Sequence, residues 1–118
     1  MKKESEAVLL RIFIGESDTY RGRPLYKHLV ETFKKQGIAG ATVLRATEGY
    51  GRTSVLHTAS ILRLSTDLPM VLEVVDTPEK IETLKNQLEG TIKGGLITEE
   101  KVKIIYYEGV DKDKPNEG

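Results

Sequence analysis

Residues 40–54 read GATVLRATEGYGRTS, and they combine a strand pattern with a glycine-rich turn. The first half favours a strand, because Thr42, Val43 and Leu44 suit the pleated, half-buried surface of a sheet. The second half contains Gly49 and Gly51, which allow a sharp turn and let a ligand approach the main chain. The stretch therefore predicts a sheet strand that ends in a tight, glycine-rich turn.

Polar residues follow this turn directly, and they support two interpretations. Arg52, Thr53 and Ser54 place a guanidinium and two hydroxyls beside exposed backbone N–H groups, a combination that can hold an anion such as phosphate. The alternative is a turn whose polar side chains face water, since short glycine motifs recur by chance. These residues alone leave both interpretations open.

The composition describes one soluble globular domain. The chain has 118 residues, 38% apolar and 31% charged, with Lys+Arg 18 balancing Asp+Glu 18, so we expect no nucleic-acid partner. It has no cysteine, and its two histidines, His28 and His57, are not spaced like the ligands of a zinc site, so we expect no metal site. No stretch has the pattern of a membrane span or a signal peptide, and we expect a cytoplasmic protein.

The first half of the chain predicts a strand followed by a helix. The apolar run Ala7–Gly15 indicates a central strand buried on both faces, in which Arg11 needs a partner or a route to solvent. Residues 24–36 carry apolar side chains at helical spacing and predict an amphipathic helix whose first turn holds Pro24.

The second half repeats this order. Residues 70–75 predict another central strand, and a second helix begins with Thr77 as its cap and Pro78 in its first position. We expect a loop over residues 93–101 and a final strand over residues 102–107.

The order βαβ followed by βαβ predicts an α+β, ferredoxin-like fold: one four-stranded antiparallel sheet with both helices on one face. We expect residues 1–110 to form this single domain and residues 111–118 to be a disordered tail, because they have nothing to bury. The other face of the sheet carries few charges, so we expect it to meet another subunit. Residues 55–65 fit neither the helix nor the strand period and predict a recognition loop between two strands.

Several sequence segments of the chain resemble segments of the PII signal-transduction proteins. The runs at residues 40–43 and 49–52, GATV and GYGR, are similar to that family's Gly-Met-Thr-Val and Gly-Phe-Gly-Arg-Gln. The phrases at residues 10–16, 22–26 and 74–77 resemble more closely an uncharacterised bacterial family of small PII-like proteins. The resemblance covers about residues 7–107, nearly the whole chain.

This resemblance implies a homotrimer that binds an adenine nucleotide, ADP or ATP, in the clefts between subunits. It implies that Thr42 lines the base pocket and that Gly51 and Arg52 meet the phosphates. Gly49 would form the turn beside them, and Thr53 stands where the family has glutamine. The facing wall of the cleft would come from Gly94, Gly95, Lys101 and Lys103. This region does not reproduce the Gly-Asp-Gly-Lys phosphate loop of the PII family.

The resemblance also implies regulation through a target protein. In PII proteins, the long loop between the second and third strands changes conformation with ligand and docks on the target. Some members of the small PII-like family accompany fluoride exporters, which makes a membrane transporter one candidate for the unidentified target.

Two other classes of function remain open. An oligomeric scaffold that binds a small anion or metabolite without nucleotide selectivity would have the same fold. An enzyme would need a nucleophile or an acid–base pair in a cleft. Glu48 and His57 are the only candidates, and neither has an evident partner, so we expect no catalytic residue.

Overall fold

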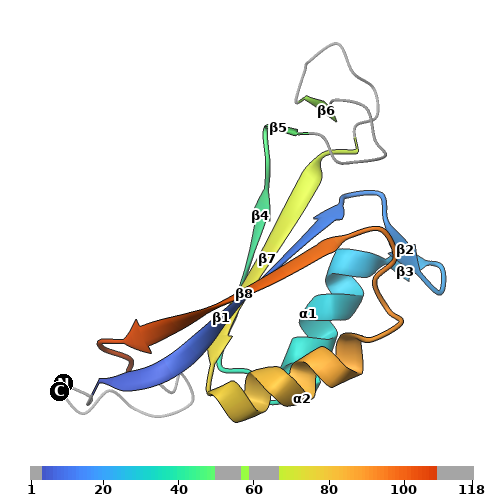
Figure 1. Cartoon of the computed structure of the whole chain (residues 1–118). Coiled ribbons are helices and arrows are strands. Elements are labelled where there is room, and N and C mark those ends of the chain that lie inside the picture. Colours follow the sequence, from blue (N-terminus) through green and yellow to red (C-terminus); the bar gives the residue numbers. More distant parts are fainter. Residues whose placement is uncertain (1–3, 50–56, 59–66, 109–118) are drawn as a thin grey trace, which may run out of the picture.

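The computed structural model describes residues 4–49, 57–58 and 67–108 of the chain (Figure 1). Its elements, in chain order, are β1 (Ser5–Gly15), β2 (Thr19–Tyr20), β3 (Arg23–Pro24), α1 (Leu25–Lys35), β4 (Ala41–Arg45), β5 (Glu48–Gly49), β6 (His57–Thr58), β7 (Pro69–Asp76), α2 (Pro78–Leu88) and β8 (Leu96–Ile104). The segment expected to form the recognition loop lies outside the described residues except at β6, and so does the expected tail.

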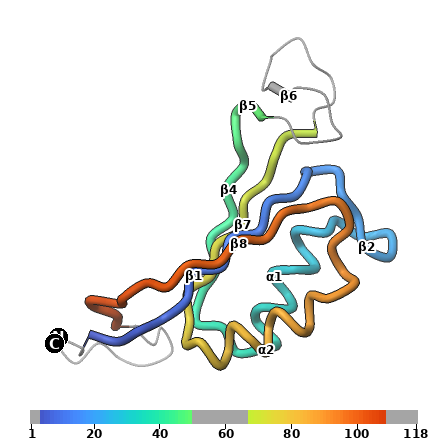
Figure 2. Tube along the Cα trace, viewed as in Figure 1, coloured from blue at the N-terminus to red at the C-terminus, as the bar shows by residue number. Residues whose placement is uncertain are grey.

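The main sheet has four strands in the order β4-β7-β1-β8, and every neighbouring pair is antiparallel. Figure 2 shows β1 and β8 side by side, and in their register Ile12 of β1 pairs with Ile97. Both helices lie on one face of the sheet (Figure 1). This confirms the expected ferredoxin-like α+β fold.

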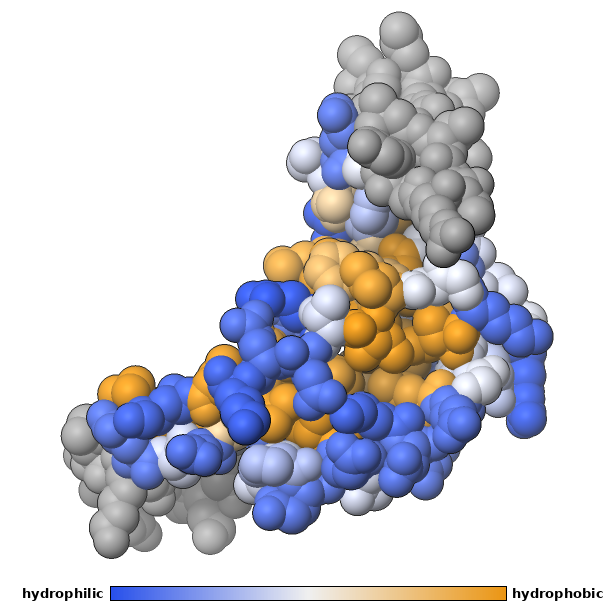
Figure 3. All heavy atoms as spheres, viewed as in Figure 1, coloured by the Kyte–Doolittle hydropathy of each residue, from blue (hydrophilic) through white to orange (hydrophobic). Residues whose placement is uncertain are grey.

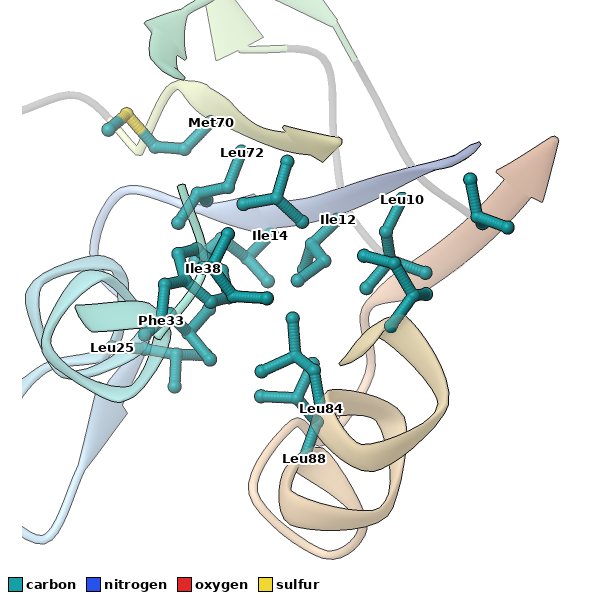
Figure 4. Packing of buried hydrophobic residues seen from close by; sticks show 14 residues of the cluster. Leu10, Ile12, Ile14, Leu25, Phe33, Ile38, Met70, Leu72, Leu84 and Leu88 are labelled. Carbon is teal, nitrogen blue, oxygen red and sulfur yellow. The ribbon is translucent and has the colours of Figure 1, made fainter. Parts of the chain in front are cut away.

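The core lies between the helices and alternate residues of the two central strands. Side chains from β1 point toward those of α1 and α2 (Figure 4). The cluster comprises Val8, Leu10, Ile12, Ile14, Met70, Leu72 and Val74 from the strands, Leu25, Leu29 and Phe33 from α1, Ile38, and Ile81, Leu84 and Leu88 from α2. Burying each of the larger side chains contributes about 1.5–3 kcal/mol to stability. Hydrophilic residues cover the outer surface of α2 (Figure 3).

The strand β1 differs in one respect from the expectation of burial on both faces. Its buried residues alternate with half-buried ones, among them Leu9, Arg11 and Phe13, because only one face carries helices. The apolar run therefore marks a central strand correctly but overstates how much of it is covered in a single chain.

The two helices begin differently. As predicted, Thr77 caps α2: its Oγ1 accepts a hydrogen bond from the Lys80 N–H at 3.2 Å, and Pro78 follows as the first helical residue. Helix α1, in contrast, begins at Leu25, and Pro24 stands before it in β3.

The hairpin β2–β3 accounts for the position of Pro24. Thr19 pairs with Pro24, and the two turn residues, Arg21 and Gly22, have φ of 51° and 80°. Positive φ at both central residues is the backbone of a type I′ hairpin turn. This hairpin was not predicted from the sequence, because its two-residue strands are too short to show a period.

The last strand is longer than expected, and the prediction of a loop over residues 93–101 is wrong. Strand β8 begins at Leu96 and pairs with β1 as far as Ile104, so Tyr106 lies beyond its end. As an edge strand it is mostly exposed on both faces, and Glu99, Glu100 and Lys101 hide any alternation of apolar and polar residues.

A carboxylate ties the end of β7 to the segment that leads into β4. Asp76 is the one buried charged residue among those described, with 9% of its surface exposed. Its Oδ2 accepts from the Ala39 N–H at 3.0 Å, and its Oδ1 accepts from the Thr77 N–H at 2.8 Å. The side chain thus satisfies two backbone donors at one end of the sheet.

We expect Asp76→Ala to lower the free energy of unfolding by about 1–3 kcal/mol, because both backbone N–H groups lose their acceptor. Urea denaturation of the purified protein measures this change. The matched control is Glu79→Ala, which removes an exposed carboxylate from the first turn of α2 and should change stability by no more than about 0.5 kcal/mol. Equal stability of Asp76→Ala and wild type would contradict the structural role of Asp76.

Candidate functional site

The face of the sheet that carries no helices, the helix-free face, combines exposed apolar residues with a smaller set of polar ones. The strand registers place on it Leu9, Arg11 and Phe13 of β1, Val71, Glu73 and Val75 of β7, Thr42 and Leu44 of β4, and Thr98, Glu100 and Val102 of β8. Leu44 is 48% exposed and Val75 36%. Large apolar side chains exposed on the face of a sheet are typical of a contact with another molecule.

An ion-pair network crosses the middle of this face. The Arg11 Nε donates to Glu73 Oε2 at 2.6 Å, and its Nη1 donates to Glu100 Oε1 at 2.8 Å, so Arg11 has the partners that its position requires. The hydrogen bond to Glu73 is the main reason that the pKa of Arg11 is raised above its usual value. Exposed pairs of this kind add little stability. Their structural effect is to hold Glu73 in a defined place.

A hollow opens beside Glu73, at the end of the sheet where β1 begins and β7 ends. It has a volume of about 590 Å³, within the usual range for small-molecule sites. Its lining consists of Ser5, Glu6, Ala7, Leu9, Ala39, Gly40, Thr42, Glu73, Val75, Asp76, Thr77, Ile104, Tyr106 and Tyr107. We call it the Thr42 hollow.

The lining of the Thr42 hollow combines a mainly apolar surface with a few polar groups. Tyr106 and Tyr107 are each 55% exposed, so their rings are accessible to a ligand. The Tyr106 hydroxyl donates to Glu108 Oε2 at 2.6 Å, and this bond raises the pKa of Tyr106 above its usual value. Such a lining suits a flat, uncharged ring that carries hydrogen-bond donors for a carboxylate.

Of the residues predicted from the sequence, Thr42 lies in this hollow and the other described ones do not. Gly49 lies beyond the far end of β4, where a Cβ would stand 2.8 Å from Pro69 Cγ. It pairs with His57 in the ribbon β5–β6. The remaining predicted loop residues, Gly51, Arg52 and Thr53, lie outside the described part of the chain.

The two predicted lysines lie on the opposite side of the sheet from Thr42. In β8, Lys101 and Lys103 alternate with residues of the helix-free face, so they share the side that carries the helices. The Lys103 Nζ lies 3.8 Å from Glu4 Oε1. Neither lysine is among the residues that line the Thr42 hollow.

The glycine pair after α2 lies at the other end of the sheet, where β8 begins. Gly94 has φ of 76°, a conformation that favours glycine. A Cβ on Gly95 would stand 2.8 Å from the Phe13 carbonyl oxygen and 2.8 Å from Ile92 Cγ2. The backbone conformation at Gly94 and the close packing at Gly95 therefore favour glycine independently of any ligand.

Tyr106, Tyr107 and Glu73 line the hollow but were not among the residues predicted from the sequence. Glu73 was noticeable as the one carboxylate within an apolar strand, and the tyrosine pair follows the last strand directly. No periodicity connects the tyrosines with Thr42, because β1 and β7 separate β8 from β4 in the sheet. Glu73 pairs directly with Thr42, but the register of two strands far apart in the sequence cannot be read from their periodicity.

Comparisons with known proteins agree with this architecture. The model of the DUF190 family, described as Uncharacterized ACR, matches residues 7–104. The chain belongs to the DUF190 family. A UPF0166 protein of Aquifex aeolicus is 43% identical over 98 residues, 83% of this chain and 92% of that protein. A second UPF0166 protein, from Methanocaldococcus jannaschii, is 40% identical over 93 residues, 78% of this chain and 85% of that protein.

Among solved structures, CPII of Thiomonas intermedia K12 superimposes with a TM-score of 0.65 and 11% identity, over 87% of this chain and 99% of that one. CPII is a nitrogen regulatory PII-like protein, and its crystals held ADP, AMP and bicarbonate. At this identity, the likeness establishes that this DUF190 protein has a PII-like fold.

Two further observations concern the described residues alone. No helix among them is long and apolar enough to cross a membrane. No group of three or more His, Cys, Asp or Glu side chains in this part of the chain could hold a metal ion.

We expect Gly95→Ala to destabilise the protein by about 1–3 kcal/mol, because the new Cβ meets the Phe13 backbone oxygen, which cannot move aside as a flexible side chain could. Thermal and urea unfolding measure this loss. The control is Gly40→Ala, where a Cβ has nothing within 4 Å. Similar stability of the two variants would show that the close approach at Gly95 is unimportant.

Proposed function

We propose that this DUF190 protein is a PII-like regulator that binds an adenine nucleotide between the subunits of a homotrimer and docks on a target protein. The observation that carries the proposal is the Thr42 hollow, which has an apolar and aromatic lining and a positioned carboxylate. It lies in a fold shared with CPII, which binds ADP and AMP. The family match itself assigns no activity.

The adenine ring would occupy the Thr42 hollow. Tyr106, Tyr107 and Val75 offer it apolar and aromatic contact, and aromatic stacking on a base contributes about 1–3 kcal/mol. Arg11 holds Oε2 of Glu73, and no hydrogen bond to the other carboxylate oxygen is found among the described residues. That oxygen can accept a hydrogen bond from the amine at C6 of adenine. Guanine has a carbonyl oxygen at C6 and could not donate this bond.

The phosphates would lie between subunits, because one chain does not bring the remaining predicted residues to the hollow. One subunit would supply Gly49, Gly51, Arg52 and Thr53 from the end of β4 and the segment after it. Its neighbour would supply Gly94, Gly95, Lys101 and Lys103. The exposed apolar residues of the helix-free face, Leu44 and Val75 among them, provide the surface for this association.

Regulation would act through the segment that follows β5, as the contact with a target protein. The balanced charge of the chain argues against a nucleic-acid partner. We propose a cytoplasmic regulator whose target is a protein, with a membrane transporter as one candidate. No catalytic residue or metal is assigned.

Calorimetric titration of ATP, ADP and AMP tests the nucleotide site. We expect binding by the wild type and a loss of about tenfold or more in Tyr106→Ala/Tyr107→Ala, because two rings leave the hollow. The control is Ile105→Ala, since Ile105 is 52% exposed and lies outside the lining. It should bind as the wild type does.

The same titration examines the phosphate end. Arg52→Ala should weaken binding about ten- to a hundredfold, because it removes a charged hydrogen bond. Undiminished affinity would remove Arg52 from the site. Absence of binding for all three nucleotides would favour an oligomeric scaffold that binds a different small anion or metabolite.

We expect light scattering to give the mass of a trimer at micromolar concentration. Leu44→Glu should shift the protein toward monomers, because a charge would enter the apolar helix-free face. Lys34→Glu, which changes an exposed residue of α1, should leave the trimer intact. A monomeric wild type would contradict the proposed assembly.

A further inference from the structure

A second hollow lies on the helix side of the sheet, between the hairpin β2–β3 and the turn that follows α2. Its volume is about 310 Å³, and it is lined by Asp18, Thr19, Tyr20, Arg21, Leu25, Gly90, Thr91 and Lys93. We call it the hairpin pocket. Leu25 belongs to the core of α1 and is 2% exposed, so this pocket is separate from the Thr42 hollow on the other face.

Backbone hydrogen bonds hold both walls of the hairpin pocket. The Leu25 N–H donates to the Asp18 carbonyl at 2.8 Å, which closes the hairpin against the start of α1. The Thr91 N–H donates to the Leu88 carbonyl at 3.0 Å and shapes the turn after α2. The pocket is therefore built from ordered backbone on two sides.

The pocket is lined by two cations, Arg21 and Lys93, and by one carboxylate, Asp18, so the charge of its lining is positive. Neither Arg21 nor Lys93 forms an ion pair among the described residues, whereas every other arginine in that part of the chain does: Arg11, Arg23 and Arg45 pair with Glu73, Glu31 and Glu16. Asp18 also lines the pocket, but its Oδ2 accepts from the Gly15 N–H at 2.9 Å. Arg21 and Lys93 thus remain available to an anion.

The side chain of Arg21 is positioned by its neighbours. Its guanidinium carbon lies 5.1 Å from the centre of the Tyr20 ring, which in turn stacks on His28 at 4.3 Å. Cation–π contact uses the face of the guanidinium and leaves the N–H groups along its edge free to donate. Arg21 also has a positive φ of 51°, which glycine would adopt at lower cost.

We propose that the hairpin pocket binds the phosphate group of a small phosphorylated molecule. The Arg21 guanidinium and the Lys93 ammonium would meet the phosphate oxygens, and the hydroxyls of Thr19 and Thr91 would donate further hydrogen bonds. Tyr20 and Leu25 provide apolar contact for the organic part of the molecule. The pocket is separate from the Thr42 hollow, but its Lys93 adjoins Gly94 and Gly95 of the proposed phosphate site, so the hairpin residues Thr19 and Arg21 distinguish the two sites.

Nuclear magnetic resonance of the full chain tests the proposal, with inorganic phosphate and glycerol 3-phosphate as probes. We expect saturable shifts of the amides of Thr19, Arg21, Thr91 and Lys93 in the millimolar range, with tighter binding for glycerol 3-phosphate. The Thr19 and Arg21 shifts should persist in the presence of saturating ADP. Shifts at the Thr42 hollow alone, or no saturable shift at all, would overturn the proposal. Because Thr19 and Arg21 belong neither to the Thr42 hollow nor to the proposed phosphate site, their amides report on the hairpin pocket alone, and failure of ADP to bind would not affect their shifts.

Variants separate a specific site from general attraction by surface charge. Arg21→Gly/Lys93→Gln should weaken binding of glycerol 3-phosphate by about tenfold or more, since it removes both cations. Glycine accepts the positive φ at position 21, so the hairpin should still form. Lys27→Gln, an exposed charge on α1 outside the pocket, should bind within about twofold of wild type. Equal affinity of the double variant and wild type would overturn the proposal.

Discussion

Strand β1 carries apolar residues on both of its faces, and the two helices cover only one of them. Its alternate residues Leu10, Ile12 and Ile14 are buried by α1 and α2, while Leu9 and Phe13 on the other face stay half-buried. Because exposed apolar surface is costly in water, this one-sided coverage leaves the helix-free face in need of a partner. The proposed assembly and the proposed nucleotide site both follow from that constraint.

The charged residues on the helix-free face form one connected ion-pair network. Arg11 lies in the middle of β1 and binds carboxylates from the strands on either side, Glu73 of β7 and Glu100 of β8. This network is partly exposed, so its contribution to the stability of a single chain is small. Its greater effect is to orient Glu73 in the lining of the Thr42 hollow. There its carboxylate would favour ligands that present a hydrogen-bond donor to it.

The two hollows differ in the chemistry that they offer. The Thr42 hollow has aromatic rings and a carboxylate acceptor, which suits an uncharged ring with donor groups. The hairpin pocket has two cations, one carboxylate and two hydroxyls, and this positive lining suits an oxyanion. A protein with both would hold separate ligands on the two faces of one sheet. That arrangement is consistent with a regulator that responds to more than one small molecule.

The sequence was sufficient to predict the fold because its main signals are strong. The apolar run of β1, the helical spacing around Leu25 and the Thr77–Pro78 helix start are all present in the structure. The start of β8 and the hairpin β2–β3 could not be predicted, since an exposed edge strand and two-residue strands show no hydrophobic period.

The candidate site was harder to predict than the fold. Thr42 was assigned from a resemblance, and the structure places it in a hollow. The tyrosines of that hollow were not predicted. They follow β8, and only the strand order of the folded sheet brings them to the same hollow as Thr42 of β4. A phosphate site that needs two subunits cannot be read from one chain at all.

Photo-crosslinking with 8-azido-ADP tests the central claim most directly, because it reports where the adenine ring lies. After irradiation and proteolysis, mass spectrometry identifies the labelled peptides. The account predicts labelling of the peptides that contain Val75 or Tyr106 and Tyr107, suppressed by excess ADP. Labelling confined to other peptides, or labelling that ADP does not suppress, would contradict it.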